Sequence, residues 1–191
     1  MFIRFTNICY NPDYKCTKYI CQVANYLMAN NTAVKIAPDF EGRYPNASAR
    51  ATESAMNLVF TAELLVKRIT GLLQPFDLSP AGGLVLSILA DSETPLPPHE
   101  IASRLIISRA TVTGLVDSLE RRGYVRRTPH RSDRRMLLIE PTETGIQVAN
   151  AFRPIVHQNQ KSWLAALSEA DQQRLIDMLH KLQAVLIEFE T

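Results

Sequence analysis

The strongest constraint on this chain is a dense run of arginines near its middle. Residues 121–135, RRGYVRRTPHRSDRR, contain seven arginines and one aspartate, or about +6, whereas the whole chain of 191 residues is only +2. The other 176 residues therefore sum to about −4. Charge concentrated this tightly is typical of a surface that meets a polyanion, and a double-stranded nucleic acid carries one phosphate charge per ~1.7 Å. The alternative is a solvated basic loop, and the residues on either side of the run must distinguish it from a surface that binds a polyanion.

The residues before this run predict two short helices joined by a tight turn. The first helix covers about residues 98–105 and opens with a proline, whose missing N–H costs nothing there. Ser108 offers an N-cap oxygen for the second helix. The apolar stripe of the second helix predicts a buried face of Val112, Leu115, Val116 and Leu119. The open face consists of Arg109, Ala110, Thr111, Thr113, Gly114 and Asp117.

Such a helix pair is a helix-turn-helix, whose second helix lies in the major groove of DNA. Small side chains let that helix approach the base edges. There arginine pairs with guanine, hydroxyls donate or accept, and threonine and alanine methyls meet thymine. The predicted base contacts are therefore Ser108, Arg109, Ala110, Thr111 and Thr113. The alternative is that two amphipathic helices simply pack in the core of another fold.

The residues after the helix pair predict a β-hairpin. Gly123 ends the second helix with a residue that tolerates positive φ. Residues 124–127 and 136–140 predict two strands, and the loop over 128–135 is long for a hairpin. A helix-turn-helix followed by such a hairpin is a winged helix, and a basic wing can reach phosphates or a narrow minor groove. Helices, hairpin and arginines together predict DNA binding.

Six segments together resemble the multiple-antibiotic-resistance regulator (MarR) family of bacteria. They are IASRL at 101–105, SRATVT at 108–113, LERRGYV at 119–125, SDRR at 132–135, LLI at 137–139 and PTETG at 141–145. The resemblance covers roughly residues 50–190 and is most specific in the wing. It implies that Asp133 positions Arg135 to enter the minor groove, with Arg131 and Arg134 as further wing contacts. One departure, Glu140-Pro141 in place of a leucine-threonine pair, is expected to alter how the wing meets the next helix.

The rest of the chain predicts helices, so the expected fold class is mainly α with a small β-hairpin wing. Helices are predicted at 51–74, 80–90, from 142 toward 167, and at 169–189 after an N-cap at Ser168. Pro154 lies inside the third of these, where a kink or break is expected. The predicted divisions are an N-terminal extension of unknown role (1–48), a dimerisation helix (49–78), the winged helix-turn-helix (79–141) and C-terminal dimerisation helices (142–191).

The long terminal helices carry more apolar surface than a winged helix of about 65 residues can cover. They either pack on it within a monomer or form a homodimer, and we favour the homodimer. A symmetric dimer sets two recognition helices about one DNA turn apart and binds a palindromic operator. The resemblance points the same way and implies an aromatic carboxylate or phenolic effector between the long helices and the winged helix. The predicted pocket residues are Phe60, Leu64, Phe76 and Leu84.

All three cysteines, Cys9, Cys16 and Cys21, lie in the N-terminal extension. An odd number without a secretory signal argues against a disulfide framework, and the spacing matches no common zinc pattern. Inert thiols, a redox-sensing role and a metal site therefore remain as alternatives, in that order. No apolar stretch approaches the ~20 residues of a membrane span, and the expected location is the cytoplasm.

No motif predicts an enzyme, a cofactor or a metal site, because there is no Gly-rich phosphate loop, no G-x-S-x-G elbow and no metal-binding histidine pair. Three hypotheses follow. The first is a DNA-binding repressor released by a small ligand. The second is a DNA-binding redox switch that uses the N-terminal cysteines. The third is a winged-helix module that binds protein, which the arginines disfavour.

Overall fold

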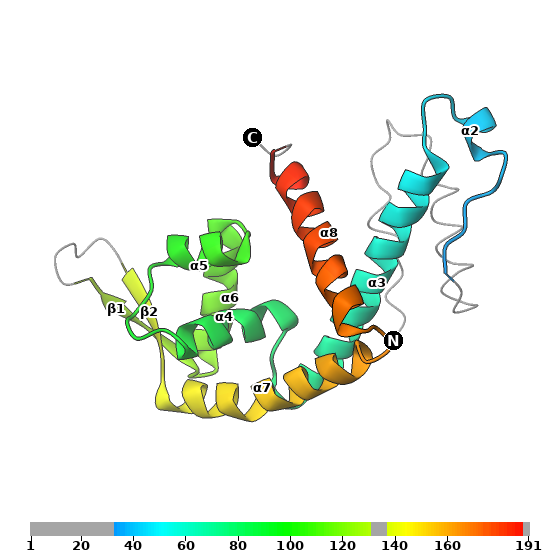
Figure 1. Cartoon of the computed structure of the whole chain (residues 1–191). Coiled ribbons are helices and arrows are strands. Elements are labelled where there is room, and N and C mark those ends of the chain that lie inside the picture. The colour runs from blue at the N-terminus through cyan, green and yellow to red at the C-terminus, as the bar shows by residue number, and fades with distance from the viewer. Residues whose placement is uncertain (1–32, 131–136, 189–191) are drawn as a thin grey trace. The chain divides into compact units, whose positions relative to one another are not determined.

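The computed structural model describes residues 33–130 and 137–188 (Figure 1). The chain divides into two compact units, Met1–Leu65 and Val66–Thr191. The division falls within one long helix, α3 (Ala49–Leu73), so each unit contains part of it. The predicted start of this helix at 51 is two residues late.

In the described part of the first unit, an extended segment is held against α3. Asn57 binds the backbone of Val34 twice, accepting from its N–H (3.1 Å) and donating to its carbonyl (3.0 Å). Glu53 accepts from the N–H of Ile36 (3.0 Å), and Val34 is only 2% exposed. The short helix α2 (Phe40–Arg43) follows. This end of the extension is therefore ordered by side chains of α3.

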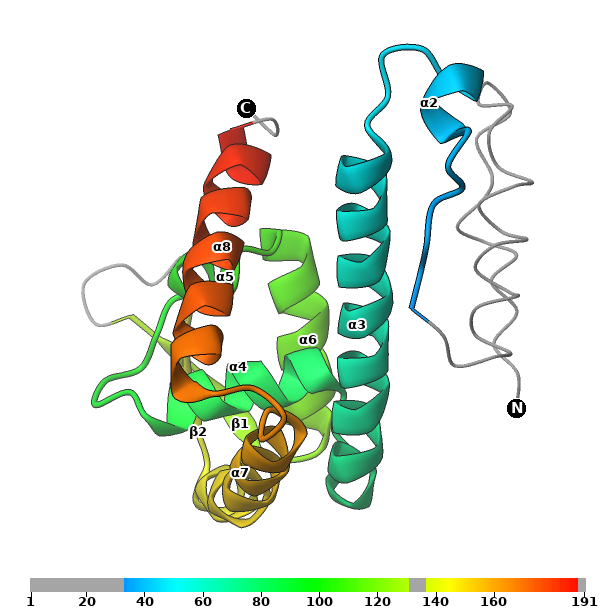
Figure 2. The ribbon, with the colours of Figure 1, turned by 45° about the vertical axis from the view of Figure 1, so that its right-hand side comes forward.

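The second unit contains the predicted winged helix. Its helices are α4 (Pro80–Ala90), α5 (Pro98–Leu105) and α6 (Arg109–Arg121), all with the predicted starts. They pack against a two-stranded antiparallel sheet of β1 (Val125–Pro129) and β2 (Leu137–Pro141), which can be followed in Figure 2. Leu96 exchanges two backbone hydrogen bonds with Ile139 (2.9 and 2.8 Å) and so joins the sheet to the segment before α5.

The core of this unit comes from every element of the winged helix. The fully buried large side chains are Leu73, Val85, Leu86, Leu89, Ile101, Val112, Val116, Leu119, Val125 and Ile139. Three of the four residues of the predicted buried stripe of α6 are buried, and Leu115 is half-buried against the core. Burying this stripe fixes which face of α6 is left outside.

The hairpin differs in detail from its prediction. Strand β1 begins at Val125 rather than Tyr124 and extends to Pro129, two residues beyond the predicted end. The continuous register from Val125↔Pro141 to Pro129↔Leu137 explains the extension, because each added residue finds a partner on β2. Met136, predicted as a strand residue, lies outside the described residues.

Two helices follow the wing. Helix α7 (Glu143–Trp163) passes through Pro154 without the expected break, because Ala149 and Phe152 before it are buried in the core and Val156 after it packs there too. It ends four residues before the predicted Leu167 in a turn closed by the Leu167 N–H to Leu164 carbonyl bond (3.0 Å). Helix α8 (Glu169–Glu188) then starts after Ser168, whose hydroxyl accepts from the N–H of Asp171 (3.2 Å) as predicted.

The long helices α3 and α8 expose many apolar side chains. On α8 they are Ile176, Met178, Leu182, Val185, Leu186 and Ile187. Within the described residues, no single helix is long and apolar enough to cross a membrane, although one pair, Ala49–Phe76 with Pro80–Ala90, bent by 67°, passes that test by length and composition. The predicted role of these surfaces in a dimer stays a prediction.

Three helix ends in the second unit share one geometry, in which a residue within two positions of the helix end is left-handed. These residues are Asp77 (φ 53°), Ile106 (φ 54°) and Gly123 (φ 72°). At each end the next N–H bonds back five residues and the left-handed residue bonds back three, which is the Schellman motif. The bonds are Leu78 N to Leu73 O and Asp77 N to Gln74 O, Ile107 N to Ala102 O and Ile106 N to Ser103 O, and Tyr124 N to Leu119 O and Gly123 N to Glu120 O.

The three residues differ in how well they suit this conformation. Glycine adopts it without steric cost, and aspartate is among the side chains that tolerate it. Isoleucine does not, because its Cβ branch crowds the following carbonyl and the left-handed region costs roughly 1–2 kcal/mol per residue. Ile106, in the turn of the helix-turn-helix, is therefore held in a strained backbone.

Candidate nucleic-acid interface

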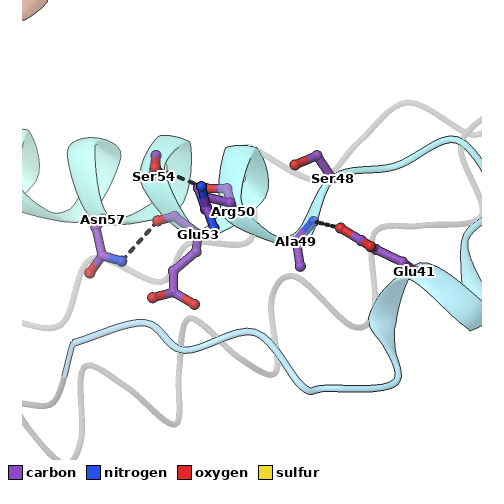
Figure 3. A pocket seen from close by; sticks show the side chains of 7 residues that line it. All are labelled: Glu41, Ser48, Ala49, Arg50, Glu53, Ser54 and Asn57. Carbon is purple, nitrogen blue, oxygen red and sulfur yellow. Dashed lines mark hydrogen bonds between the residues drawn. The ribbon is translucent and has the colours of Figure 1, made fainter.

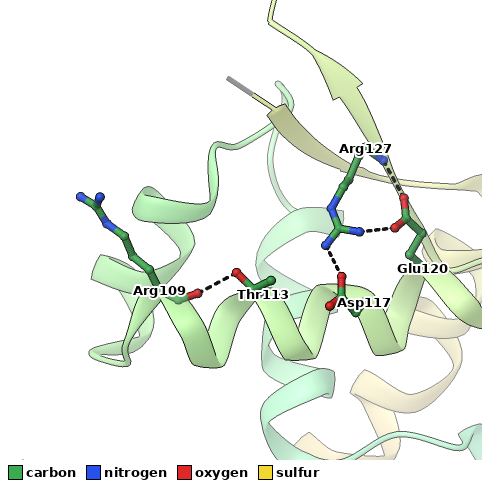
Figure 4. Close-up of polar contacts among 5 residues, drawn as sticks. All are labelled: Arg109, Thr113, Asp117, Glu120 and Arg127. Atoms are coloured by element: carbon green, nitrogen blue, oxygen red, sulfur yellow. Dashed lines mark hydrogen bonds and ion pairs between the residues drawn. The ribbon is translucent and has the colours of Figure 1, made fainter. Parts of the chain in front are cut away.

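The first turn of α6 is built around one hydroxyl. Ser108 is extended (φ −68°, ψ 151°) and its Oγ accepts from the N–H of Thr111 at 3.1 Å, as the N-cap prediction requires. The same Oγ lies 2.8 Å from Oγ1 of Thr111. One turn later, Oγ1 of Thr113 donates to the Arg109 carbonyl at 3.0 Å (Figure 4). The Ser108 hydroxyl therefore also caps the helix start.

The predicted open face of α6 is confirmed by its exposure. Arg109, Ala110, Thr111, Thr113, Gly114 and Asp117 are all exposed. Figure 4 shows the Arg109 side chain extending away from the body of the unit. A helix start lined with small side chains and one long cation has the chemistry of a surface that enters a groove and contacts base edges.

A network of charges joins α6 to the first strand of the wing. Arg127 of β1 forms ion pairs with Asp117 and Glu120 of α6, and its backbone N–H donates to Glu120 Oε1 at 3.2 Å (Figure 4). The pKa of Arg127 is raised, chiefly by its hydrogen bond to Asp117; burial opposes this rise, and the charge of Glu120 adds to it. The guanidinium thus balances two acids that would otherwise stand beside the exposed face of α6.

The sequence did not predict this network, because the arginine run counts there only as positive charge. In the structure, Arg126 pairs with Glu140 (2.7 Å) across the hairpin, so an acid of the wing itself neutralises part of the +6. The sequence contained one signal of this network, the spacing of Asp117 and Glu120, which are three residues apart and so lie on the same face of a helix. It could not identify the partner, which lies on another element.

A second pair ties the end of α6 to the turn before α4. Arg122 donates to Asp77 Oδ2 at 2.7 Å and to the Ser118 carbonyl at 2.8 Å. The hydrogen bond from Arg122, followed by its charge, lowers the pKa of Asp77. Tyr124 adds a hydrogen bond from its hydroxyl to the Phe76 carbonyl (3.2 Å). Residues 45 apart in sequence thus fix the orientation of α6, and no local pattern could predict that.

The wing leads into α7 through a tight junction. The N–H of Thr142 donates to the Tyr124 carbonyl (3.0 Å), and its Oγ1 donates to the Gly123 carbonyl (2.6 Å) while accepting from the N–H of Gly145 (3.0 Å). Thr142 therefore caps α7 and fastens it to the start of β1. The Glu140-Pro141 departure leaves this cap intact, with Pro141 still paired to Val125.

Several predicted residues cannot be placed against this surface. The wing contacts Arg131, Asp133, Arg134 and Arg135 lie outside the described residues, and so do Cys9, Cys16 and Cys21. Of the predicted pocket residues, Phe60 and Leu64 belong to the first unit. In the second unit, Phe76 packs edge-on against Phe152 (ring centroids 6.0 Å apart), whereas Leu84 is exposed. The effector pocket stays a prediction.

A different, polar cavity occurs in the first unit. Its volume is about 740 Å³, and Figure 3 shows it beside the start of α3. It is lined by Glu41, Ser48, Ala49, Arg50, Glu53, Ser54 and Asn57. Glu41 accepts from the N–H of Ala49 (2.9 Å), and Glu53 and Asn57 hold residues 34–36, so these polar groups stabilise the N-terminal extension. Among the described residues, no cluster of histidine, cysteine and acidic side chains fits a metal ion.

The winged-helix part of the chain is similar in sequence to a known protein family. A sequence model of the MarR family matches residues 76–136, which include the helix-turn-helix and most of the wing. This segment of the chain therefore resembles the MarR family. The repressor YetL of Bacillus subtilis, an HTH-type transcriptional repressor, is 32% identical over 99 residues, which are 51% of this chain and 59% of YetL. The chain spans 55% and 59% of the length of two curated regulators that it matches, PecS of Dickeya dadantii and YetL.

Solved structures agree with the fold of a MarR protein. The MepR–DNA complex of Staphylococcus aureus superimposes with a TM-score of 0.66 at 23% identity, over 69% of this chain and 96% of that chain. CouR of Rhodococcus jostii, bound to p-coumaroyl-CoA, gives 0.63 at 23% identity, over 71% and 95%. PecS and YetL are regulators of transcription, in agreement with the prediction that this chain is not an enzyme.

Proposed function

We propose that this chain is a sequence-specific DNA-binding transcriptional regulator that uses α6 as its recognition helix. The observation that carries the proposal is the exposed start of α6, where Arg109, Ala110 and Thr111 follow the N-cap residue Ser108. Regulator and repressor names among the relatives, and DNA in the MepR complex, support the same activity. Because DNA is the partner, the cytoplasm is the expected compartment.

The finer parts of the proposal concern assembly and control. A homodimer through the long helices would cover the exposed apolar residues of α8 and place two copies of α6 on a palindromic operator. A small aromatic or phenolic ligand would release the operator by favouring a dimer geometry with a different spacing of the two helices. Phe60, Leu64, Phe76 and Leu84 remain the proposed lining of its pocket, and Arg131, Asp133, Arg134 and Arg135 the proposed wing contacts.

A salt titration tests DNA binding itself. The full-length protein is mixed with a duplex selected from a random pool, and the selected site is compared with a footprint upstream of the chain's own gene. Affinity is expected to fall by at least about 10²-fold between 50 and 200 mM salt, since bound arginines release counterions from phosphates. A protein-binding module would give no selected sequence and no such dependence.

Arg109→Ala tests the recognition helix. Loss of a bidentate arginine–guanine contact is expected to cost about 1–3 kcal/mol of binding and to relax base preference at one position. Arg174→Ala, which removes the same charge from exposed α8, is the matched control and should preserve the selected sequence. Undiminished discrimination by the Arg109 variant, measured by competition with single-base operator mutants, would mean that another face reads the DNA.

Ser108 is a poorer probe than the sequence suggested. Its hydroxyl caps α6, so Ser108→Ala is expected to lower helix stability by about 1 kcal/mol as well as to alter base contacts. The Arg135→Ala wing variant avoids that ambiguity. It is expected to weaken binding with little change in base preference at the positions read by α6.

A further inference from the structure

We propose that Ile106, in the turn between α5 and α6, is a DNA-contacting residue that packs its side chain against carbon atoms of the operator. The inference rests on the proposed DNA-binding function and adds a residue outside the recognition helix. The carbon is either the 5-methyl group of a thymine or a deoxyribose ring, which are the two apolar surfaces that a duplex offers beside the phosphates.

Ile106 does not suit the backbone that it occupies. The three Schellman ends of this unit have the same hydrogen bonds, and two of them place glycine or aspartate at the left-handed position. The third places Ile106 there (φ 54°, ψ 47°), in a turn that often contains glycine in helix-turn-helix proteins. Strained backbone of this kind gathers at functional sites, where the side chain is needed for something other than stability.

The Ile106 side chain is also exposed. Its exposed fraction is 66%, the largest value among the large apolar side chains of the described residues. Its neighbour Ile107 is half-buried and packs against the core, so Ile107, not Ile106, provides the apolar contact of this helix end. The Ile106 side chain therefore carries two costs, a strained backbone and an exposed apolar surface, and it is not among the side chains that pack against the core.

Ile106 lies next to the surface proposed to meet DNA. It precedes the N-cap Ser108 by two residues, and the exposed stretch from Ser108 to Thr111 is the part of α6 proposed to enter the major groove. A residue at this place comes close to the DNA whenever the start of α6 does. An exposed apolar group there gains binding energy by leaving water on contact with DNA carbon.

The test uses variants that relieve the strain and remove the carbon. Ile106→Gly and Ile106→Asn both suit a left-handed residue, so each is expected to raise Tm by about 2–4 °C. Each is also expected to bind the selected operator about tenfold more weakly, because most of the apolar contact is lost. Ile106→Val keeps the branched Cβ and most of the carbon, and is expected to resemble the parent in both measurements.

The test depends on the two expected effects having opposite directions, a higher Tm and a lower operator affinity. A residue with only a structural role would not weaken DNA binding while the protein becomes more stable. Tyr44→Ala, which removes an exposed apolar side chain (40%) from the segment after α2, is the control and should leave operator affinity unchanged. The salt dependence should also be unchanged in the Ile106 variants, since no phosphate contact is removed.

Replacing operator thymines by deoxyuridine separates the two sources of carbon. Weaker binding by the parent, but not by Ile106→Gly, assigns the thymine methyl, and equal binding by both oligonucleotides assigns the deoxyribose. Both results support the contact. Parent-like operator affinity of the glycine and asparagine variants would overturn it. Failure of the parent to bind any duplex would overturn the proposed function as well, so the two failures are distinguishable.

Discussion

Gly145→Ala is expected to destabilise the winged helix by at least about 3 kcal/mol, enough to leave much of the protein unfolded. A Cβ on this buried residue would lie 1.9 Å from the Tyr124 carbonyl oxygen, far inside any contact distance. That carbonyl accepts the N–H of Thr142, so the backbone cannot retreat without breaking the junction between the wing and α7. Urea unfolding followed by circular dichroism measures the loss.

The matched control is Gly71→Ala. Gly71 lies in α3, and nothing lies within 4 Å of the position that a Cβ would take there, so alanine is expected to stabilise that helix by up to about 1 kcal/mol. Equal stability of the Gly145 variant and the parent would show that α7 can shift away from β1. The wing would then be less firmly attached to α7 than its hydrogen bonds indicate.

Arg127→Met is expected to weaken operator binding about tenfold to a hundredfold. Without the guanidinium, Asp117 and Glu120 keep two uncompensated negative charges beside the side of α6 that is proposed to face DNA, where they would repel phosphates. Adding Asp117→Asn to this variant should recover part of the affinity, because one of the two repelling charges is removed. Equilibrium binding at two salt concentrations measures both steps.

Arg153→Met separates this effect from general destabilisation. Arg153 is exposed to the same degree as Arg127 (22% against 25%) and pairs with Asp91, away from α6. Its loss should lower stability slightly and leave operator affinity at the parent value. If Arg127→Met binds as tightly as Arg153→Met, the acids of α6 lie too far from the phosphates to matter.

The helix-turn-helix was predictable because its signals are local. The proline at the start of α5, the hydroxyl of Ser108 and the apolar stripe through Val112 and Val116 each act within a few residues, and the structure contains each as predicted. The unbroken α7 was not predictable in this way. Whether Pro154 breaks the helix depends on whether the turns before and after it pack against the core. Phe152 before it is buried, and Val156 after it packs against the core.

The charges show the same division between local and distant causes. Counting arginines gives a strongly basic segment, but the count assigns no partners. The partners of Arg122, Arg126 and Arg127 are Asp77, Glu140, Asp117 and Glu120, and all of them lie on other elements or distant turns. The segment is therefore less basic at the surface than its composition indicates.

The sequence by itself determined that this chain forms a winged helix whose second helix exposes a face of small and polar side chains, since periodicity, caps and turn residues specify helices and strands over short distances. Only the tertiary structure decided which cations face outward, where glycine is indispensable, and that an isoleucine occupies a left-handed turn beside that face. These depend on atoms brought together from positions up to 62 residues apart, where the free energy of packing outweighs local preference.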